Sequence, residues 1–372
     1  MTTTINNEHK KLNVPNLRFK EFQGEWEEYT LQDVVTFSNG KAHENCVNDD
    51  GDYILVNSKF VSTNGQVQKR VTSQLSPLHK SQFVMVMSDL PNGKALAKCF
   101  YVEEDNKYTL NQRVCSFTSN DGNVSRFLMY QINRNKYYLR FDDGINQTNL
   151  KKSEVLSCPV FIPIVREQEK IATLLCKIDE RIATQNKIID KLQTLIKGIA
   201  QKIVRSNKPN VRLYECVECS SSTQQESEVC EQGAYPVYGA NGIVGYLDDY
   251  NTEGEAVYII KDGSGVGTVS YVTGKCSATG TLNTLQAKDG YSLQYLYYLL
   301  KVFNFEPYKT GMAIPHIYFK DYGKAKVFCP SYTEQLQYAR LLSAIDSKLS
   351  VEKNTLRNLS LQKQYLLRQM FI

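Results

Sequence analysis

Two stretches of the chain are near copies of each other: residues 163–182 read PIVREQEKIATLLCKIDERI, and residues 330–349 read PSYTEQLQYARLLSAIDSKL. A shift of 167 positions places Pro163, Glu167 and Gln168 on identical residues. The same shift aligns a further identical set: Ala172, Leu174, Leu175, Ile178 and Asp179 with Ala339, Leu341, Leu342, Ile345 and Asp346. A repeat of this length is far longer than a solenoid unit, so it indicates a duplicated domain.

Each copy leads into apolar residues with a 4-3-4-3 spacing, which is the heptad pattern of a coiled coil. The pattern predicts two long helices that pair with each other in an antiparallel direction. The first seam comprises Ile171, Leu175, Ile178, Ile182, Gln185, Ile189, Leu192, Ile196, Ile199 and Ile203. The second comprises Tyr338, Leu342, Ile345, Leu349, Glu352, Leu356, Leu359, Lys363, Leu366 and Met370. A long helix on an ordinary core, or helices that pair with other chains, are the alternatives.

One polar residue interrupts the first seam near its middle. This residue, Gln185, aligns with Glu352 in the second seam. Because the midpoints of an antiparallel pair meet, we expect the two side chains to share one layer of the coiled coil. A buried polar layer fixes the register of two helices at some cost in stability.

The repeat continues outside the helices with weaker matches. Gly144 and Phe161 recur as Gly311 and Phe328, and Tyr101-Val102 recurs as Tyr271-Val272. Thr109-Leu110-Asn111 recurs as Thr281-Leu282-Asn283. The blocks that hold these residues contain short β-rich runs separated by Gly, Asn, Asp and Pro, with one short helical run each. They read as small α+β domains.

The sequence therefore predicts an α+β protein with two small α+β domains, two long helices in an antiparallel coiled coil, and an internal pseudo-two-fold repeat. The predicted boundaries are an N-terminal tail and opening segment at 1–25, a first domain at 26–163, a first long helix at 164–206, a second domain at 207–330 and a second long helix at 331–372.

The composition narrows the class of protein. The chain has 372 residues, a net charge of +5 and 42% hydrophobic residues, which is typical of an ordered soluble protein. The chain shows neither an apolar run of membrane-spanning length nor a secretory signal, so we expect a cytoplasmic protein without a membrane partner. In that compartment most of the ten cysteines should be free thiols.

Motifs for catalysis or metal binding are weak. Gly263-Ser-Gly265-Val-Gly267 lies between two strand-like runs, so a hairpin loop is favoured over a phosphate-binding loop. Cys216-Val-Glu-Cys219 with the later Cys230 is the one zinc candidate, but a single C-x-x-C motif has no second pair. We therefore predict no catalytic residue, no metal site and no cofactor in this chain.

The blocks carry basic, amide and aromatic residues in predicted loops. Arg and Lys suit phosphates and guanine edges, whereas Asn and Gln suit adenine. In the first block the candidate DNA-binding residues are Lys41, Asn57, Ser58, Lys59, Lys69, Arg70, Lys94, Arg113, Asn146, Gln147, Lys151 and Lys152. In the second they are Tyr238, Asn241, Lys261, Ser264, Lys275, Asn283, Lys309, His316 and Lys320.

The ordered set of motifs resembles the specificity subunits of type I restriction–modification systems along nearly the whole chain. The resemblance rests on Pro15-Asn-Leu-Arg-Phe-Lys-Glu-Phe22 with Trp26 and Leu31, on the Gly144 and Gly311 segments, and on the Pro…Glu-Gln motif before each heptad helix. It implies two target-recognition domains at opposite ends of the helix pair, each reading one half of a split double-stranded DNA target.

The resemblance also implies partners. Two methyltransferase subunits would bind S-adenosylmethionine and methylate one adenine in each half-site, and restriction (motor–nuclease) subunits would complete the complex. After Gly311 the second copy has Ala313-Ile-Pro315-His316, where the first has Asn146-Gln147-Thr148. The two half-sites are therefore expected to differ.

Two other functions stay open at this point. One is an enzyme, a hydrolase or nuclease whose site has no motif. The other is a coiled-coil scaffold with two heads that bind protein or RNA.

Overall fold

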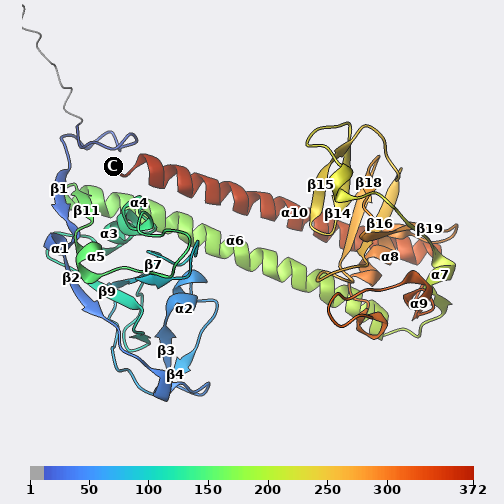
Figure 1. The fold of residues 1–372 in the computed structure, drawn as a ribbon, viewed down its shortest axis with the longest axis horizontal. Helices are drawn as coiled ribbons and strands as arrows, with labels where there is room; N and C mark the ends of the chain where they lie inside the picture. The colour runs from blue at the N-terminus through green and yellow to red at the C-terminus, as the bar shows by residue number, and fades with distance from the viewer. Residues whose placement is uncertain (1–11) are drawn as a thin grey trace, which may run out of the picture. The chain divides into compact units, whose positions relative to one another are not determined.

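The computed structural model describes residues 12–372, which fall into two compact units. Unit 1 comprises the chain up to Ala183 together with Arg357–Ile372, and unit 2 comprises Thr184–Leu356. Each unit contains one predicted α+β domain and one part of each long helix. Figure 1 shows the elements of both units, coloured along the chain.

Unit 1 contains one antiparallel sheet, one mixed sheet and two short strand pairs. The larger sheet has the strand order β2-β9-β5-β7, the second sheet β4-β3-β8, and the pairs are β1-β11 and β10-β6. Its strands are β1 Glu27–Thr30, β2 Val35–Asn39, β3 Tyr53–Val56, β4 Arg70–Val71, β5 Phe83–Val86, β6 Ser88–Asp89, β7 Cys99–Tyr101, β8 Tyr108–Leu110, β9 Val114–Ser119, β10 Thr148–Asn149 and β11 Pro159–Ile162. Its short helices are α1 Leu31–Val34, α2 Ser58–Ser62, α3 Ser125–Ile132, α4 Lys136–Leu139 and α5 Lys152–Leu156.

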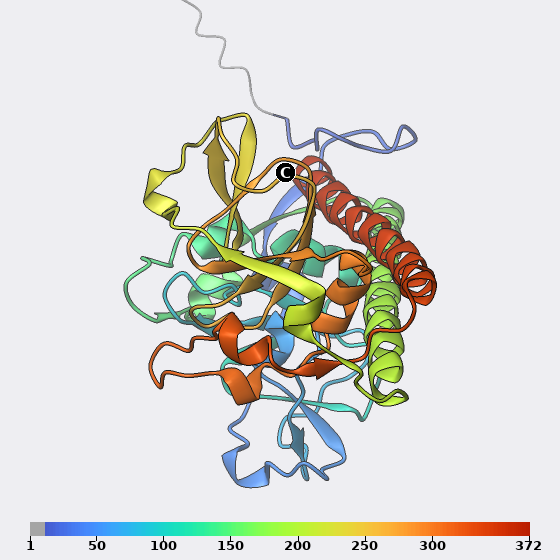
Figure 2. The same ribbon diagram turned by 90° about the vertical axis from the view of Figure 1, so that its right-hand side faces the viewer.

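Unit 2 repeats the two sheets and one of the strand pairs of this plan. Figure 2 shows the molecule with this unit toward the viewer. Its sheets have the orders β13-β19-β16-β17 and β15-β14-β18, and β12 pairs with β20. Its strands are β12 Val211–Arg212, β13 Val217–Ser221, β14 Tyr235–Gly239, β15 Gly242–Leu247, β16 Glu255–Ile260, β17 Val269–Thr273, β18 Ser277–Ala278, β19 Leu282–Ala287 and β20 Lys326–Val327. Its short helices are α7 Leu213–Cys216, α8 Leu293–Leu300 and α9 Phe319–Tyr322.

Strand register tests the weaker matches of the repeat. In unit 1 Phe83 lies opposite both Tyr101 and Phe117, and in unit 2 Val257 lies opposite both Tyr271 and Leu285. Tyr101 and Tyr271 are therefore equivalent, which confirms that match. The Thr-Leu-Asn match is wrong: Leu110 ends β8, whereas Leu282 begins β19. A short motif of β-forming residues recurs easily by chance, so identity alone did not fix the register.

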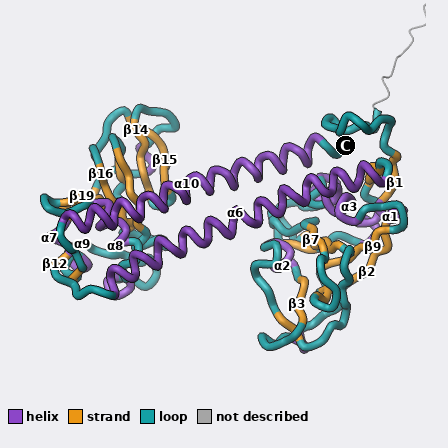
Figure 3. The backbone as a smooth tube through the Cα atoms, turned by 180° about the vertical axis from the view of Figure 1, so that it is seen from behind, coloured by secondary structure: helices purple, strands orange, loops and turns teal. Residues whose placement is uncertain are grey.

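The long helices are α6, Val165–Arg205, and α10, Tyr332–Gln369. Figure 3 shows both in purple, side by side. In unit 1 Ile171 and Leu175 of α6 share a core with Met370 near the end of α10. In unit 2 Ile189, Ile196 and Ile203 of α6 share a core with Ala339, Leu342 and Leu349 of α10. The later part of one helix thus packs on the earlier part of the other, so the segments are antiparallel.

The seam positions face inward along both helices. Of the predicted seam residues, Ile171, Leu175, Ile178, Gln185, Ile189, Ile196, Leu342, Leu349 and Glu352 are buried, and Ile182, Leu192, Ile345, Leu356 and Leu359 are half-buried. Gln185 and Glu352 share one layer: the Gln185 amide donates to the Glu352 backbone carbonyl at 3.1 Å and to its carboxylate.

The repeated Pro…Glu-Gln motif ties each long helix to a short one. The buried Gln168 amide donates to the Pro163 carbonyl at 2.9 Å and accepts the backbone N–H of Val124, just before α3, at 2.9 Å. Gln335 makes the same two bonds, to Pro330 and from Ser292 before α8, each at 2.9 Å. A glutamine can bond to the proline carbonyl and to the backbone N–H at the same time, because its amide carries a donor and an acceptor.

Trp26 and the end of the C-terminal helix pack together in unit 1. Trp26 is buried, with its ring edge-on to Phe127 at 5.7 Å and to Phe371 at 6.5 Å between centroids. These aromatic contacts hold the end of the C-terminal helix on the first domain. Within residues 12–372, no helix combines the length and the apolar character that crossing a membrane requires.

Candidate nucleic-acid interface

Two neighbouring loops of unit 1 form what we call the first loop pair, residues 87–95 and 142–149. The short pairing of β6 with β10 places Ser88 opposite Asn149. The Ser88 hydroxyl donates to Asn149 Oδ1 at 2.6 Å, and the Gln147 amide donates to Ser88 Oγ at 2.8 Å. Asn92 donates to the Gly144 carbonyl at 3.1 Å, which joins the loop tips. The result is a hydrogen-bonded cluster of short polar side chains.

The second loop pair, residues 261–267 and 309–316 of unit 2, has the same place in its unit. Asp262 lies opposite His316 in an isolated bridge, and their side chains meet at 2.6 Å between Oδ1 and Nδ1. The Gly263 N–H donates to the Pro315 carbonyl at 3.0 Å. His316 is the residue that the 167-residue shift aligns with Asn149. A serine–amide pair in unit 1 is thus replaced by an ionisable pair in unit 2.

Each loop pair exposes large apolar side chains beside its polar cluster. Ile145 is 79% exposed and Leu90 is 68% exposed in the first pair. Met312, which the shift aligns with Ile145, is 106% exposed, and Ile314 is 59% exposed in the second. Apolar side chains this exposed, set beside polar clusters on both units, are typical of a surface that contacts another molecule.

Glycine is required where each loop turns. Gly144 and Gly311 have φ of 71° and 85°, a region that other residues rarely adopt. A Cβ on Gly311 would also lie 2.4 Å from the Ile314 carbonyl oxygen. This explains why the glycine recurs while the residues after it change.

Several predicted residues of the first block gather at the first loop pair. Lys94, Asn146, Gln147 and Lys151 lie in or next to its two loops. Asn146 is engaged inside its own turn, because its amide donates to Asp143 at 2.9 Å. Bonds to Asp143 from the backbone and side chain of Asn146 and from the Ile145 N–H hold the pKa of that carboxyl at about 2. Asp143 therefore stays charged and fixes the turn.

The other candidates of the first block lie elsewhere in unit 1. Asn57 caps α2 by accepting the Phe60 N–H at 2.9 Å, and Ser58 and Lys59 begin that helix. Lys69 and Arg70 lie at β4, with the Arg70 guanidinium donating to the Gly51 carbonyl at 3.0 Å. Lys41, Arg113 and Lys152 are exposed on further loops and at the start of α5. This set spreads over the β4-β3-β8 sheet and its surroundings rather than forming one cluster.

In the second block, Lys261, Ser264, Lys309 and His316 belong to the second loop pair, and Lys320 follows on α9. Lys309 pairs with Glu306 at 2.6 Å. Tyr238 and Asn241 lie on the β14–β15 hairpin, and Lys275 pairs loosely with Glu253 at 3.8 Å. Asn283 is buried, donates to the Tyr322 hydroxyl at 2.9 Å and accepts from Ser221, so it belongs to the sheet interior.

The cysteines of the zinc hypothesis do not converge. Cys216 is buried beside Cys329, whereas Cys219 donates to a neighbouring backbone carbonyl and Cys230 is exposed. Within residues 12–372 no group of three or more Cys, His, Asp or Glu could hold a metal ion. All ten cysteines are free thiols.

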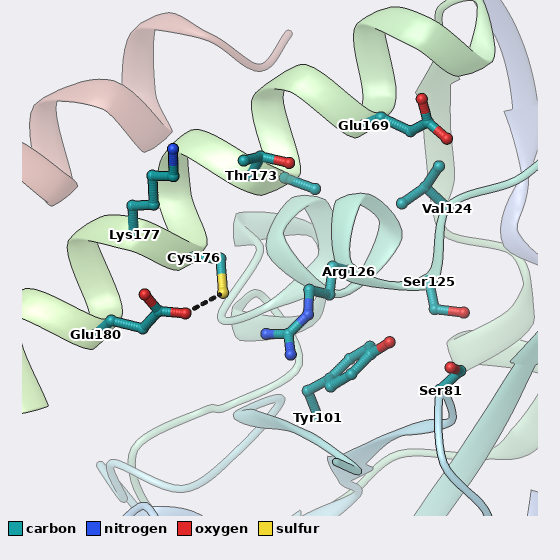
Figure 4. Close-up of a pocket in the computed structure, with 11 residues that line it drawn as sticks. Ser81, Tyr101, Val124, Ser125, Arg126, Glu169, Thr173, Cys176, Lys177 and Glu180 are labelled. Atoms are coloured by element: carbon teal, nitrogen blue, oxygen red, sulfur yellow. Dashed lines mark hydrogen bonds between the residues drawn. The ribbon is translucent and has the colours of Figure 1, made fainter.

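Each unit also has a groove beside α6 or α10. In unit 1 a groove of about 460 Å³ is lined by Tyr101, Arg126, Glu169, Cys176, Lys177 and Glu180, among others. The Arg126 guanidinium lies 3.9 Å from the centroid of the Tyr101 ring, and the Cys176 thiol donates to Glu180 at 3.5 Å (Figure 4). The groove is therefore lined by several charged side chains, two of which contact other residues of the lining.

The equivalent groove of unit 2 has a different lining. It measures about 370 Å³ and is lined by Tyr271, Gln294, Tyr297, Ser343, Asp346 and Ser347, among others. Tyr271 occupies the position equivalent to Tyr101, while Gln294 and Ser347 occupy the positions of Arg126 and Glu180. Tyr298 also donates to Asp346 at 3.3 Å, as Tyr130 donates to Asp179 at 2.7 Å in unit 1. Tyr101 and Tyr130 thus have tyrosine equivalents in unit 2, whereas Arg126 and Glu180 have uncharged ones.

Sequence reasoning missed Ser88, Asn149 and Asp262. Asn149 could have been found, because the 167-residue shift places it on His316. Ser88 and Asp262 carry no such signal, since their strands enter each loop pair from a part of the chain where the two copies differ in length.

Comparison with known proteins gives the family. Residues 23–194 and residues 210–360 each match the family described as "Type I restriction modification DNA specificity domain". The EcoprrI type I restriction enzyme specificity subunit of Escherichia coli is 27% identical over 117 residues, which cover 32% of this chain and 29% of that protein. A putative type I specificity subunit of Mycoplasma genitalium is 25% identical over 256 residues, covering 63% of this chain and 66% of that one. The matched stretches thus span from under a third to about two thirds of these relatives.

The fold is shared with solved structures of low sequence identity. The crystal structure of the type I restriction–modification S subunit from M. genitalium has a TM-score of 0.70 at 18% identity, covering 96% of this chain and 99% of that one. A structure from a study of complex assembly in the type I system has a TM-score of 0.52 at 15% identity, covering 97% and 99%. With both of its domains matched, the chain belongs to the family of type I restriction–modification DNA specificity domains.

Proposed function

We propose that this chain is the DNA-recognition subunit of a type I restriction–modification complex and reads a split double-stranded target. The observation that carries the proposal is the pair of equivalent loop sites, which keep one backbone arrangement and differ in chemistry. Ser88 with Asn149 offers hydroxyl and amide groups, whereas Asp262 with His316 offers a carboxylate and an imidazole. Two loop pairs with different hydrogen-bonding groups suit two half-sites of different sequence.

Phosphate contacts would come from lysines and arginines around the loop pairs. Within residues 12–372, the side chains of Lys94, Lys151 and Lys261 form no ion pair or hydrogen bond, so their charges are available. Such contacts position a protein on DNA without reading sequence. The polar pairs would then supply the sequence discrimination.

The partners follow from the family and from the repeat. Two copies of one methyltransferase subunit would bind the features that both units share, and restriction subunits would complete the complex. S-adenosylmethionine would be held by the methyltransferase, and this chain would supply no catalytic group or cofactor. A system of this kind works on DNA in the cytoplasm.

Methylation sequencing of DNA modified by the full complex tests the proposal. We expect a two-part motif with one modified adenine in each half. His316→Ala should change the base preference of one half only, and Asn149→Ala that of the other half only. Lys94→Ala is the matched control: it should weaken binding across all sequences and lower the salt dependence of binding by about one phosphate contact. If either polar variant alters both halves, the two units are not independent readers.

The scaffold alternative makes a different prediction. A coiled-coil scaffold with protein- or RNA-binding heads would give no preferred duplex sequence, even with the methyltransferase present. A purified chain that transfers a methyl group from S-adenosylmethionine without a partner would instead support an enzyme.

A further inference from the structure

Two buried cysteines of unit 2 face each other at a place that the proposed function does not use. Cys216 ends α7, and Cys329 lies between β20 and α10. Their sulfur atoms are 3.7 Å apart, and both side chains are buried. A disulfide needs about 2.0 Å between sulfur atoms, so a small side-chain rotation would bring them to bonding distance.

The fold itself does not require this pair. In unit 1 the equivalent positions hold Val34, which ends α1, and Ile162, which ends β11. Strand pairing supports the equivalence, because β1 pairs with β11 as β12 pairs with β20. Two aliphatic residues therefore fill this space in one copy, and two thiols fill it in the other.

The surroundings give the two thiols different roles. The two thiols share a hydrogen bond in which either sulfur can be the donor. This contact lowers the pKa of Cys216, with smaller contributions in the same direction from Tyr291 and Lys288, while burial acts against it. The same bond and burial raise the pKa of Cys329. The lowered pKa favours the thiolate at Cys216 over Cys329, and the thiolate is the reactive form of cysteine.

We propose that Cys216 and Cys329 form an intramolecular disulfide when the protein meets hydrogen peroxide. The Cys216 thiolate attacks one peroxide oxygen, the O–O bond breaks, and the leaving hydroxide takes up a proton to become water. The resulting sulfenic acid is attacked by Cys329 sulfur, which forms the S–S bond and releases a second water with the Cys329 proton. Two thiols are oxidised by two electrons, and one peroxide is reduced to two waters.

The bond would join two distant parts of unit 2. It would close a chain segment of 113 residue positions, from the first short helix of the unit to the segment that leads into α10. Closing a long loop restricts the unfolded chain, so the oxidised unit 2 should be more stable. Intracellular disulfides are commonly transient and redox-sensing, which fits a pair that is reduced in the resting protein.

Mass spectrometry of the full-length chain tests the proposal. The protein is treated with hydrogen peroxide, its free thiols are blocked with iodoacetamide, and it is digested without reduction. We expect a linked peptide containing Cys216 and Cys329 as the main cross-link, loss of that peptide on treatment with dithiothreitol, and a higher unfolding temperature of the oxidised protein. The Cys216→Ser and Cys329→Ser variants should lose the cross-link and the temperature shift.

The exposed Cys230 provides the matched control, since Cys230→Ser should keep both effects. Survival of Cys216 and Cys329 as free thiols in peroxide that fully oxidises Cys230 would overturn the proposal. A main cross-link between Cys216 and its sequence neighbour Cys219 would overturn it as well. The readouts involve no DNA, so they are independent of the recognition function.

Discussion

Units 1 and 2 share one framework, but they hold the start of their long helices differently. In unit 1 Arg18 reaches from the N-terminal segment to the fully buried Glu167, with two bonds at 2.7 and 2.8 Å. In unit 2 the matching Glu334 is exposed and bonds to Ser331 before α10. Duplication has thus kept the amide bonds of Gln168 and Gln335 while the charges around them changed. A side-chain amide that bonds to backbone groups keeps its partners as long as the fold is kept, whereas an ion pair depends on the identity of one partner residue.

The largest expected difference between the units comes from this ion pair. Arg18→Met would leave the buried Glu167 carboxylate without its partner, which costs about 3–5 kcal/mol in similar cases. Glu334→Gln, the control in unit 2, should cost about 1 kcal/mol or less, because the group is exposed.

Tryptophan fluorescence can measure this contrast in urea. The single tryptophan, Trp26, is buried in unit 1, so its emission reports the unfolding of that unit. If the Arg18→Met midpoint stays within error of the unaltered chain, the buried pair contributes nothing to holding unit 1 together.

Gln168 and Gln335, which tie each long helix to a short one, should instead contribute similar stability to their units. Gln168→Ala and Gln335→Ala each remove the two shared hydrogen bonds and leave a buried N–H and a carbonyl unpaired, at a cost of about 2–3 kcal/mol in either unit. Gln168→Ala also removes a longer bond, at 3.3 Å, to the Gly122 carbonyl. Hydrogen exchange of α3 and α8 would locate the loss in unit 1 for the first variant and in unit 2 for the second. Unequal losses would show that the shared motif does not have the same role in both units.

A smaller asymmetry is expected at the tyrosine–aspartate bonds. Tyr130 donates to Asp179 at 2.7 Å, and that carboxylate also pairs with Lys363, whereas Tyr298 donates to Asp346 at 3.3 Å. Tyr130→Phe should therefore cost about 1–2 kcal/mol and Tyr298→Phe about 0.5–1 kcal/mol. Urea unfolding of both variants measures the two losses of unfolding free energy. A larger loss for Tyr298→Phe than for Tyr130→Phe would contradict the expected order.

The smallest effect is the pH dependence that Glu352 contributes in unit 2. Lys348, and then the Gln185 amide, lower the pKa of Glu352 below its ordinary value. A carboxyl with a lowered pKa in the folded state stabilises the fold above its unfolded pKa, and that stability is lost as pH falls through the folded pKa. Between pH 5 and pH 3 the unaltered chain should lose slightly more stability than Glu352→Gln, as followed by thermal unfolding. Identical pH profiles for the unaltered chain and the Glu352→Gln variant would show that Glu352 carries no charge in its layer with Gln185.

Much of the fold could be read from residues close in sequence. The heptad spacing predicted α6 and α10 because helical periodicity is a local property, and the matched positions of Gln185 and Glu352 predicted their shared layer. Gly144 and Gly311 recurred in the repeat, and the structure gives the reason, because a positive φ is a local demand of the backbone. The family resemblance followed from the order of these local signals, which the duplication presents twice.

What only the tertiary structure decided are the pairs that join distant parts of the chain. Ser88 meets Asn149 across 61 positions, Asp262 meets His316 across 54, and Cys216 meets Cys329 across 113. None of these pairs has a periodic signal, because each depends on which strands become neighbours in a sheet. The mistaken Thr-Leu-Asn match has the same cause: strand register is set by hydrogen bonding and packing between strands, and not by residue identity within one strand.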